Sequence, residues 1–202
     1  EFGDEQVSER RVEKGERRNV FTLTYVGVMA PQYDLQPLKS LVKNRKDIML
    51  RFVGVVSDDT MKEIESWGVC TEFVPYVSHA EAIAYMRSAD ALILFIPNVP
   101  NNEGILTGKL FEYLASWRPV LGIGQPDGAM SMILNTTKTG VVLDWEDKAS
   151  IARYIDFCWE RHLAGKLTVE DADISQFTRR NLTRQMAELF DKVTESTSSG
   201  NI

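Results

Sequence analysis

The sequence contains few of the residues that build disulfide frameworks, metal centres or membrane spans. Its 202 residues include only two cysteines, Cys70 and Cys158, and two histidines, His79 and His162. The cysteines lie far apart in apolar patterns, so we expect two buried free thiols of a reducing compartment and no metal site. The histidines have no partner at ligand spacing, and we expect surface or packing roles for them. No apolar run reaches the length of a membrane-spanning helix.

Several motifs of α/β enzymes are also missing. The first predicted strand ends at Gly27 without the G-x-G-x-x-G pattern of nicotinamide and flavin sites. There is no Walker lysine and no G-x-S-x-G nucleophile elbow. Asp171 and Asp173 match the D-x-D of metal-dependent sugar transferases, but they lie between two predicted helices, so we expect no metal role for them. The net charge of −6 argues against a nucleic-acid surface.

What the sequence does contain is a regular alternation of short apolar runs and amphipathic segments. Capping-box patterns at Thr60 to Glu63 and at Ser78 to Glu81 mark two helix starts. The alternation predicts an α/β domain with a doubly wound, mostly parallel, six-stranded Rossmann-like sheet and helices on both faces. The six predicted strands are Phe21 to Val26, Met49 to Val56, Thr71 to Val74, Ala91 to Ile96, Val120 to Ile123 and Gly140 to Leu143.

Composition sets the expected boundaries of the domain. Residues 1–19 are charged and poor in large apolar side chains, which predicts a linker or a cloning remnant. Residues 20–195 form the predicted folded domain, and residues 196–202, rich in Ser, Thr and Gly, are predicted to be a disordered tail. The last helix of the domain carries an apolar stripe at Leu182, Met186, Leu189, Phe190 and Val193.

One stretch places charged residues at the start of a helix. Thr107-Gly108-Lys109 opens a helical pattern that stops before Pro119. A helix N-terminus has free backbone N–H groups that can meet an anion, and Lys109 adds a positive charge there. Glu112 lies one turn later on the same side, where its carboxylate can accept two hydroxyl hydrogen bonds, as from a ribose. The residues alone leave a second interpretation open, which is a capped helix with a solvated lysine and glutamate.

Residues 107–121, Thr-Gly-Lys-Leu-Phe-Glu-Tyr-Leu-Ala-x-x-Arg-Pro-Val-Leu, resemble the donor-binding signature in the C-terminal domain of GT-B glycosyltransferases. The similarity is to the large family of retaining bacterial sugar transferases that build capsule, O-antigen and exopolysaccharide. Other pieces agree in order and extend the resemblance over about residues 20 to 193, namely Tyr25-Val-Gly27, Phe52-Val-Gly54, Phe73 to Val77, Ser88 to Leu94 and the helix after Phe177.

The resemblance implies one half of a two-domain enzyme. Residues 20–195 would be the nucleotide-sugar-binding domain of a metal-independent, retaining hexosyltransferase that needs no cofactor besides its nucleotide-diphosphate-sugar substrate. A sugar or lipid-linked acceptor would bind an N-terminal domain that is missing here, and we expect no nucleic-acid partner. The isolated domain is expected to be inactive and cytoplasmic, with attachment to the inner face of the membrane only through the missing domain.

The resemblance also implies roles for single residues. Glu112 matches the carboxylate that grips the ribose hydroxyls. Lys109 and the amides of Thr107 and Gly108 would meet the diphosphate. Gly27 matches the small residue that lets a backbone approach the phosphates.

The base and the donor sugar involve other positions, and here the sequence departs from the family. Tyr76 and Val77 fall where the base is held. Glu103 is the candidate for a contact with the donor sugar, although it lies one residue farther from the ribose glutamate than is usual. Residues 28–34 hold no Lys or Arg, whereas many members carry a basic residue there for phosphate. Trp117 stands where the family usually has a helix-ending glycine, and we expect this difference to be structural.

Two alternatives remain at this stage. The chain could be half of a GT-B-type nucleotide-sugar epimerase or phosphorylase, for which Glu103 and His79 are the acid–base candidates. It could also be a non-enzymatic small-molecule-binding or protein-binding α/β module, which closed, apolar strand-end loops and an outward-pointing Lys109 would favour. In the family the last helix often covers the N-terminal domain, so in this chain we expect it to fold back or to pair with a neighbouring chain.

Overall fold

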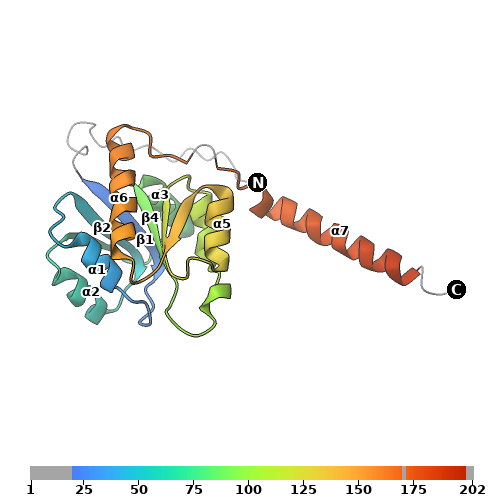
Figure 1. Ribbon diagram of the computed structural model, residues 1–202, viewed down its shortest axis with the longest axis horizontal. Helices are drawn as coiled ribbons and strands as arrows, with labels where there is room; N and C mark the ends of the chain where they lie inside the picture. Colours follow the sequence, from blue (N-terminus) through green and yellow to red (C-terminus); the bar gives the residue numbers. More distant parts are fainter. Residues whose placement is uncertain (1–19, 170–171, 199–202) are drawn as a thin grey trace.

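The computed structural model describes residues 20–169 and 172–198, and its centre is a single six-stranded sheet (Figure 1). The strand order is β3-β2-β1-β4-β5-β6, and every neighbouring pair is parallel. This confirms the predicted Rossmann-like sheet and makes it wholly parallel. The strands are β1 (Phe21–Val28), β2 (Ile48–Val55), β3 (Cys70–Val74), β4 (Ala91–Phe95), β5 (Val120–Ile123) and β6 (Gly140–Leu143).

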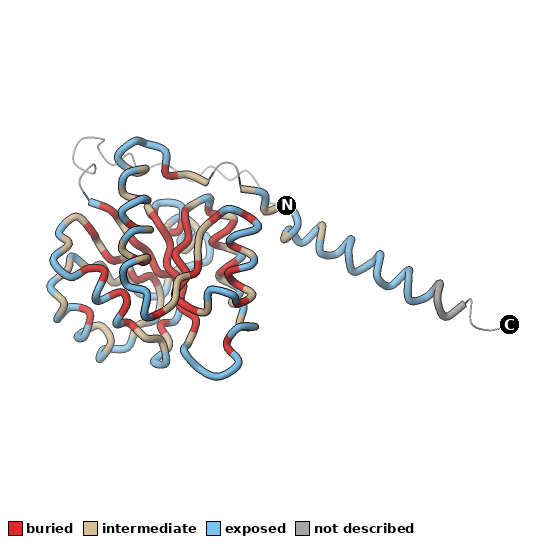
Figure 2. Tube along the Cα trace, viewed as in Figure 1, coloured by how far each residue is buried: buried red, intermediate tan, exposed pale blue. Residues whose placement is uncertain are grey.

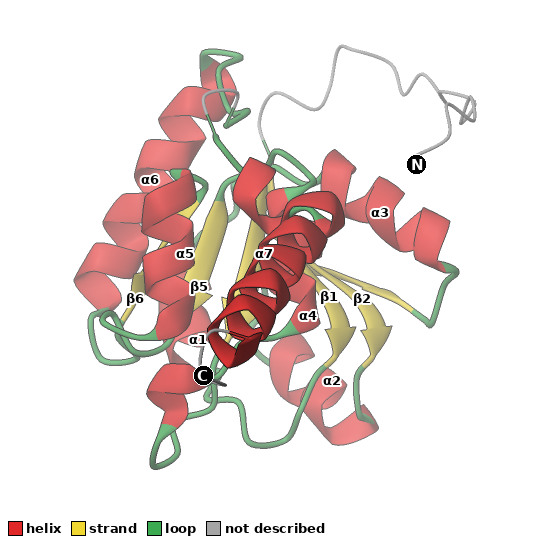
Figure 3. Cartoon of the chain, turned by 90° about the vertical axis from the view of Figure 1, so that its right-hand side faces the viewer, coloured by secondary structure: helices red, strands yellow, loops and turns green. Residues whose placement is uncertain are grey.

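Helices alternate with the strands and cover both faces of the sheet. Helices α1, α2 and α6 lie on one face, where α1 contacts α6, and α3, α4 and α5 lie on the other (Figures 1 and 3). Among the described residues, no helix combines the length and the apolar character that crossing a bilayer demands. The helices are α1 (Gln36–Val42), α2 (Asp58–Glu65), α3 (His79–Ser88), α4 (Gly108–Leu114), α5 (Ala129–Thr137), α6 (Lys148–Leu163) and α7 (Arg179–Ser198), with short 3-10 turns η2 (Asn102–Gly104) and η3 (Ser175–Phe177).

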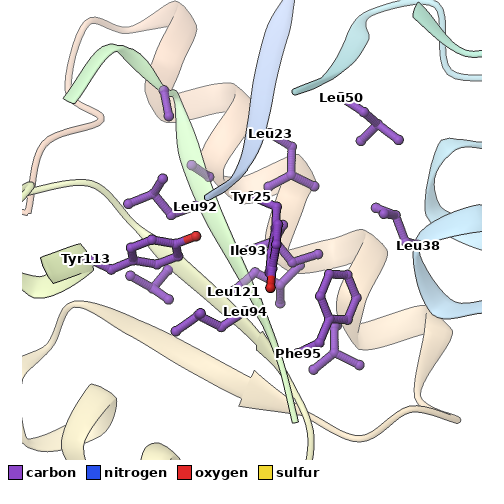
Figure 4. Packing of buried hydrophobic residues seen from close by; sticks show 14 of the residues in the cluster. Leu23, Tyr25, Leu38, Leu50, Leu92, Ile93, Leu94, Phe95, Tyr113 and Leu121 are labelled. Carbon is purple, nitrogen blue, oxygen red and sulfur yellow. The ribbon is translucent and has the colours of Figure 1, made fainter. Parts of the chain in front are cut away.

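The core lies where the sheet is covered on both sides. All five residues of β4 are buried, as expected for a central strand of a parallel sheet (Figure 2). The rings of Tyr25 and Phe95 contact each other at an angle of 50° with their centres 5.9 Å apart, and Leu38 of α1 packs beside them (Figure 4). This packing fixes the strand ends from which the candidate functional loops leave.

Two helix starts were predicted from capping boxes, and the structure confirms one of them. Ser78 accepts a hydrogen bond from the Glu81 amide at 3.3 Å, and the Glu81 carboxylate accepts one from the Ser78 amide at 2.9 Å. The box predicted at Thr60 was wrong, because Ser57 caps α2 and accepts from the Thr60 amide at 3.3 Å. The earlier start places two aspartates, Asp58 and Asp59, in the first turn, where the helix dipole favours negative charge.

The histidines have the packing and surface positions that the sequence predicts. His79 is exposed at the start of α3. His162, near the end of α6, stacks on Trp159 with ring centres 5.3 Å apart, and its Nδ1 lies 2.9 Å from Asp90 Oδ1. The second oxygen of Asp90 accepts from the Thr22 amide at 2.8 Å, so this group joins α6 to the amino end of β1.

The C-terminal helix does not fold back on the domain, so of the two expected outcomes only pairing with a neighbouring chain stays a prediction. Helix α7 projects away from the sheet and its helices, and its large apolar side chains are exposed (Figures 1 and 2). It continues to Ser198, beyond the expected boundary at 195. The predicted linker 1–19 and residues 199–202 of the predicted tail lie outside the described residues, as does Asp171 of the D-x-D pair.

The two cysteines differ in environment, and the prediction that both are buried was wrong. Cys70 is exposed because it begins β3, which lies at the edge of the sheet. Cys158 lies on the buried side of α6, and burial raises the pKa of its thiol to about 12.

We predict that a thiol-specific colorimetric reagent at pH 8 modifies Cys70 rapidly and Cys158 only after unfolding. The thiolate is the reactive form, and both burial and the raised pKa suppress it at Cys158. Native protein should therefore release one equivalent of chromophore and denatured protein two. Cys70→Ser serves as the control, and rapid modification of this variant in its native state would contradict the prediction.

Candidate functional site

The sheet has a topological switch point between β1 and β4. The chain leaves β1 for α1 on one face and leaves β4 for α4 on the other, so the two connecting loops separate. The strands themselves pair only through Leu23 with Ala91 and Thr24 with Leu92. Beyond these pairs the carboxyl end of β1 has no strand partner on its β4 side. Parallel α/β sheets bind ligands at such a point.

Tyr113 of α4 occupies the place that a β4 residue would otherwise take. Its hydroxyl oxygen accepts a hydrogen bond from the Val26 amide at 2.8 Å, and the side chain is fully buried beside Leu92 (Figure 4). Burial raises the pKa of the Tyr113 hydroxyl far above its usual value, so the group stays protonated. Because Tyr113 lies one turn after Lys109, this bond fixes the first turn of α4 over the end of β1.

Gly54, Gly27 and Lys109 form a closely packed stack at the end of β1. Gly27 and Gly54 are register partners with φ of +138° and +125°, a conformation that glycine adopts readily and other residues rarely do. A Cβ on Gly54 would lie 2.3 Å from the Gly27 carbonyl oxygen. A Cβ on Gly27 would lie 1.8 Å from Lys109 Cε and 2.3 Å from its Nζ. The structure therefore brings together Gly27 and Lys109, which are distant in sequence.

The first turn of α4 leaves polar groups available beside this stack. Among the described residues, the amides of Thr107, Gly108 and Lys109 make no hydrogen bond. The hydroxyl oxygen of Thr107 is buried without a partner there. A Cβ on Gly108 would meet nothing within 4 Å, so the space above this turn is open. Free N–H groups with a lysine beside them suit an anion such as phosphate.

Glu112 lies on the next turn of α4 and is half-buried. Within the described parts of the chain, its carboxylate makes no hydrogen bond and no ion pair, and no internal arginine holds it. A carboxylate in this position can accept hydrogen bonds from a ligand hydroxyl pair. Lys109 and Glu112 thus present opposite charges one turn apart at the switch point.

Glu103 lies on the exposed 3-10 turn η2, in the loop between β4 and α4. Side-chain hydrogen bonds help to hold this loop, one from Asn102 Nδ2 to the Pro97 carbonyl at 3.0 Å and one from Trp145 Nε1 to the Ile96 carbonyl at 3.2 Å.

The backbone of this loop packs against the start of α5. A Cβ on Gly128 would lie 3.0 Å from the Glu103 carbonyl oxygen, so a larger residue at position 128 would displace η2. The Glu103 side chain stays exposed at the carboxyl edge, but no contact links it to Lys109 or Glu112.

Tyr76 and Val77 follow β3, on the outer side of β2. Tyr76 is 83% exposed and Val77 is half-buried against the core. Both lie at the carboxyl edge of the sheet, but the structure does not join them to the Lys109 group by a contact. The loop after β1 contributes no positive charge, and its Asp34 and Tyr33 instead line a shallow cavity of about 180 Å³ next to α2.

A larger cavity of about 350 Å³ lies elsewhere, at the amino ends of β5 and β6. Pro119, Gly140 and Tyr154 line it, and none of the predicted donor-binding residues does. The volume of a cavity therefore does not identify the candidate site. The stronger indications are the switch point, the free amides and the placement of Lys109 on Gly27.

Comparison with known proteins bears on the fold. No protein-family model and no curated protein matches the sequence. Among solved structures, HepE from Anabaena in complex with UDP matches with a TM-score of 0.64 at 16% identity, and sucrose-phosphate synthase from Thermosynechococcus elongatus with 0.65 at 17%. The matches cover 86% and 89% of this chain, but 49% and 47% of those chains.

The fold is that of one half of a GT-B glycosyltransferase. This chain spans about half the length of HepE and of sucrose-phosphate synthase. A third structure, the catalytic domain of cholesterol-alpha-glucosyltransferase from Helicobacter pylori, matches with a TM-score of 0.56 at 17% identity over 72% of this chain and 90% of that one.

Sequence reasoning missed the role of Tyr113. An aromatic residue on the apolar side of a helix is usually a core residue. Nothing in the pattern therefore indicated that the Tyr113 hydroxyl accepts a hydrogen bond from the backbone of β1. The pairing of Gly27 with Gly54 had a visible signal, because the same Val-Gly-Val sequence occurs at residues 26–28 and 53–55.

We predict that Tyr113→Phe lowers the free energy of unfolding by about 1 to 3 kcal/mol, because the buried Val26 N–H loses its partner. Denaturant titration followed by tryptophan fluorescence measures the change. Tyr76→Phe is the matched control, since the exposed Tyr76 side chain should tolerate the change within about 0.5 kcal/mol. Equal stability of both variants would show that the Tyr113 bond contributes nothing.

We predict that Gly27→Ala destabilises the domain by about 1 to 3 kcal/mol, since it forces a positive φ on alanine and displaces Lys109. In a Lys109→Ala background the loss should be smaller, because the clash with Cε is gone. Gly108→Ala is the control, with open space at its Cβ and no expected loss. A double-mutant cycle from denaturant titrations gives the coupling free energy between positions 27 and 109. A coupling free energy of zero would contradict the predicted clash between them.

Proposed function

We propose that this chain is the donor-binding half of a retaining, metal-independent glycosyltransferase. Its donor substrate is a nucleotide-diphosphate sugar, from which it transfers a hexose. The observation that carries the proposal is the position of Lys109, whose side chain lies on Gly27 at the switch point beside the free amides of α4. The resemblance of residues 107–121 to the GT-B donor signature supports it, as does the GT-B fold.

In this proposal the diphosphate binds at the first turn of α4. The Lys109 ammonium and the amides of Thr107 and Gly108 meet the phosphate oxygens, and Gly27 allows the phosphates to approach the end of β1. When the bond between the sugar C1 and the phosphate oxygen breaks, the diphosphate leaves with the electron pair. The same positive groups stabilise this developing charge, which is the main contribution that such a site makes to the rate.

Glu112 accepts hydrogen bonds from the two ribose hydroxyls, for which its free carboxylate is suited. Tyr76 and Val77 contact the base, and Glu103 contacts the donor sugar. HepE binds UDP and UDP-glucose in its crystal structures, which makes uridine nucleotides the first probes to use.

The acceptor enters from a second, N-terminal half. Its hydroxyl oxygen bonds to C1 on the face that the diphosphate leaves, and its proton passes to the departing diphosphate oxygen. No cofactor takes part besides the nucleotide sugar. We place the reaction in the cytoplasm, in the synthesis of a surface polysaccharide, with any membrane attachment made through the acceptor half. This chain alone binds donor weakly and transfers nothing.

The test is a calorimetric titration of this chain with UDP, GDP and uridine. Glu112→Ala should weaken both UDP and uridine by about tenfold or more, because a hydrogen bond to a charged group is lost from the ribose. Lys109→Ala should weaken UDP similarly and leave uridine unchanged, because uridine has no phosphate.

Glu160→Ala provides the matched control, since it removes an exposed carboxylate on α6 far from the carboxyl edge. Its UDP affinity should equal that of the wild type. Equal UDP affinity in the wild type and in Glu112→Ala would rule out the ribose role, and UDP binding that ignores Lys109→Ala would rule out the phosphate site.

A further inference from the structure

The cavity of about 350 Å³ at the amino ends of β5 and β6 has no part in the proposed donor site. Helices α5 and α6 run opposite to these strands, so both helices end at the amino edge of the sheet (Figure 3). The residues that line the cavity come from the ends of these two helices and from segment 167–169. A cavity of about 150 Å³ already holds a benzene ring, so this one has room for a small ligand.

Two cations line this cavity, and they come from different helices. Arg161 lies in the last turn of α6, and Lys138 directly follows α5. Among the residues that the structure describes, neither side chain makes an ion pair, and no acidic side chain lines the cavity. An anion bound in the cavity would therefore give both cations a partner and form charge-assisted hydrogen bonds with them.

Contacts on α6 orient the Arg161 guanidinium at the wall of the cavity. It lies over the Phe157 ring, with 5.6 Å between Cζ and the ring centre. Burial raises the pKa of the Tyr154 hydroxyl and of the Cys158 thiol, and the charge of Arg161 opposes this rise at both groups. Tyr154 and Cys158 also line the cavity, so the guanidinium is close to its wall. An arginine that is already oriented loses less side-chain entropy when an anion binds.

Lys138 occupies a backbone position at which glycine is usual. It follows the last residue of α5 with a φ of +55°, and its amide donates to the Asn135 carbonyl at 3.2 Å. Helices commonly end with glycine in this left-handed conformation, because a side chain there is strained. The dipole of α5 favours a cation at this end, but a lysine at the exposed position 136 would meet the same dipole without the strain. A binding role at position 138 accounts for the strained lysine.

The wall that segment 167–169 contributes is apolar. Leu167 is buried and Val169 is half-buried, and the Val169 amide donates to the Trp117 carbonyl at 3.2 Å, which holds this wall in place. Two cations suit a phosphate group, with its charge of about −1.5 to −2, better than the single charge of a carboxylate. We propose that the cavity binds a phosphate ester of a small apolar ring, with the phosphate on Arg161 and Lys138 and the ring against Leu167 and Val169. The inference does not depend on the proposed donor site.

Calorimetric titration of this chain with phenyl phosphate tests the site. Phenyl phosphate should bind about tenfold or more tightly than inorganic phosphate, which lacks the ring, and than phenol, which lacks the charge. A wild type that binds phenyl phosphate no more tightly than these two compounds would overturn the proposal.

Two substitutions of arginine by glutamine locate the site. Arg161→Gln should weaken phenyl phosphate by about tenfold or more, because a hydrogen bond between two charged groups is lost. Arg153→Gln is the matched control, since it makes the same change at an exposed arginine of α6 that does not line the cavity, and it should bind as the wild type does. Lys109→Ala should also bind as the wild type does. Binding that Lys109→Ala abolishes and Arg161→Gln leaves intact would place the ligand at the proposed donor site and contradict this inference.

Lys138→Gly separates a binding role from a structural one. Glycine removes the cation and suits the left-handed backbone, so this variant should resist denaturant at least as well as the wild type. Its affinity for phenyl phosphate should nevertheless fall by about threefold or more, because one exposed charge pair is lost. An affinity equal to that of the wild type in both Lys138→Gly and Arg161→Gln would show that the two cations do not form the site.

Discussion

The hydrogen bond from the Val26 amide to the Tyr113 hydroxyl joins α4 to β1 at the edge of the sheet that carries the candidate site. A central strand of a parallel sheet needs partners on both sides, yet β1 and β4 separate after two residue pairs. Without a substitute, the buried Val26 N–H would be unsatisfied at a cost of about 1 to 3 kcal/mol. Tyr113 supplies the partner from a helix instead of a strand. The same bond that completes the sheet therefore positions α4.

The position of α4 determines the electrostatics of the switch point. Lys109 lies against the backbone of Gly27, and Glu112 follows without an internal counter-ion in the described chain. A lysine that lies on glycine backbone is already partly ordered, so less side-chain entropy is lost when an anion binds. With no basic residue in the loop after β1, Lys109 is the cation on which a phosphate site here would depend.

The alternation of apolar runs with amphipathic segments was sufficient to predict the sheet. Strands of a parallel sheet are buried on both faces, so they appear in the sequence as short continuous apolar runs. The alternation could not show which strands lie at the edge, and for that reason Cys70 was wrongly expected to be buried. The contact between Gly27 and Lys109 depends on tertiary packing, so spacing alone could not predict it, and the resemblance to a known signature suggested both residues separately. Trp117 was correctly expected to be a structural substitution for glycine, since it adopts a φ of +59° at the end of α4.

The end of α4 has a consequence for the chain that follows. The Trp117 carbonyl accepts a hydrogen bond from the Val169 amide at 3.2 Å, and Phe111 receives the ring of Phe177. Both contacts bind the segment before α7 to the helix that carries Lys109. A force on α7 from a bound molecule would therefore reach α4 and the turn after it through these contacts. The projecting helix and the candidate anion-binding turn are thus attached to the same part of the domain.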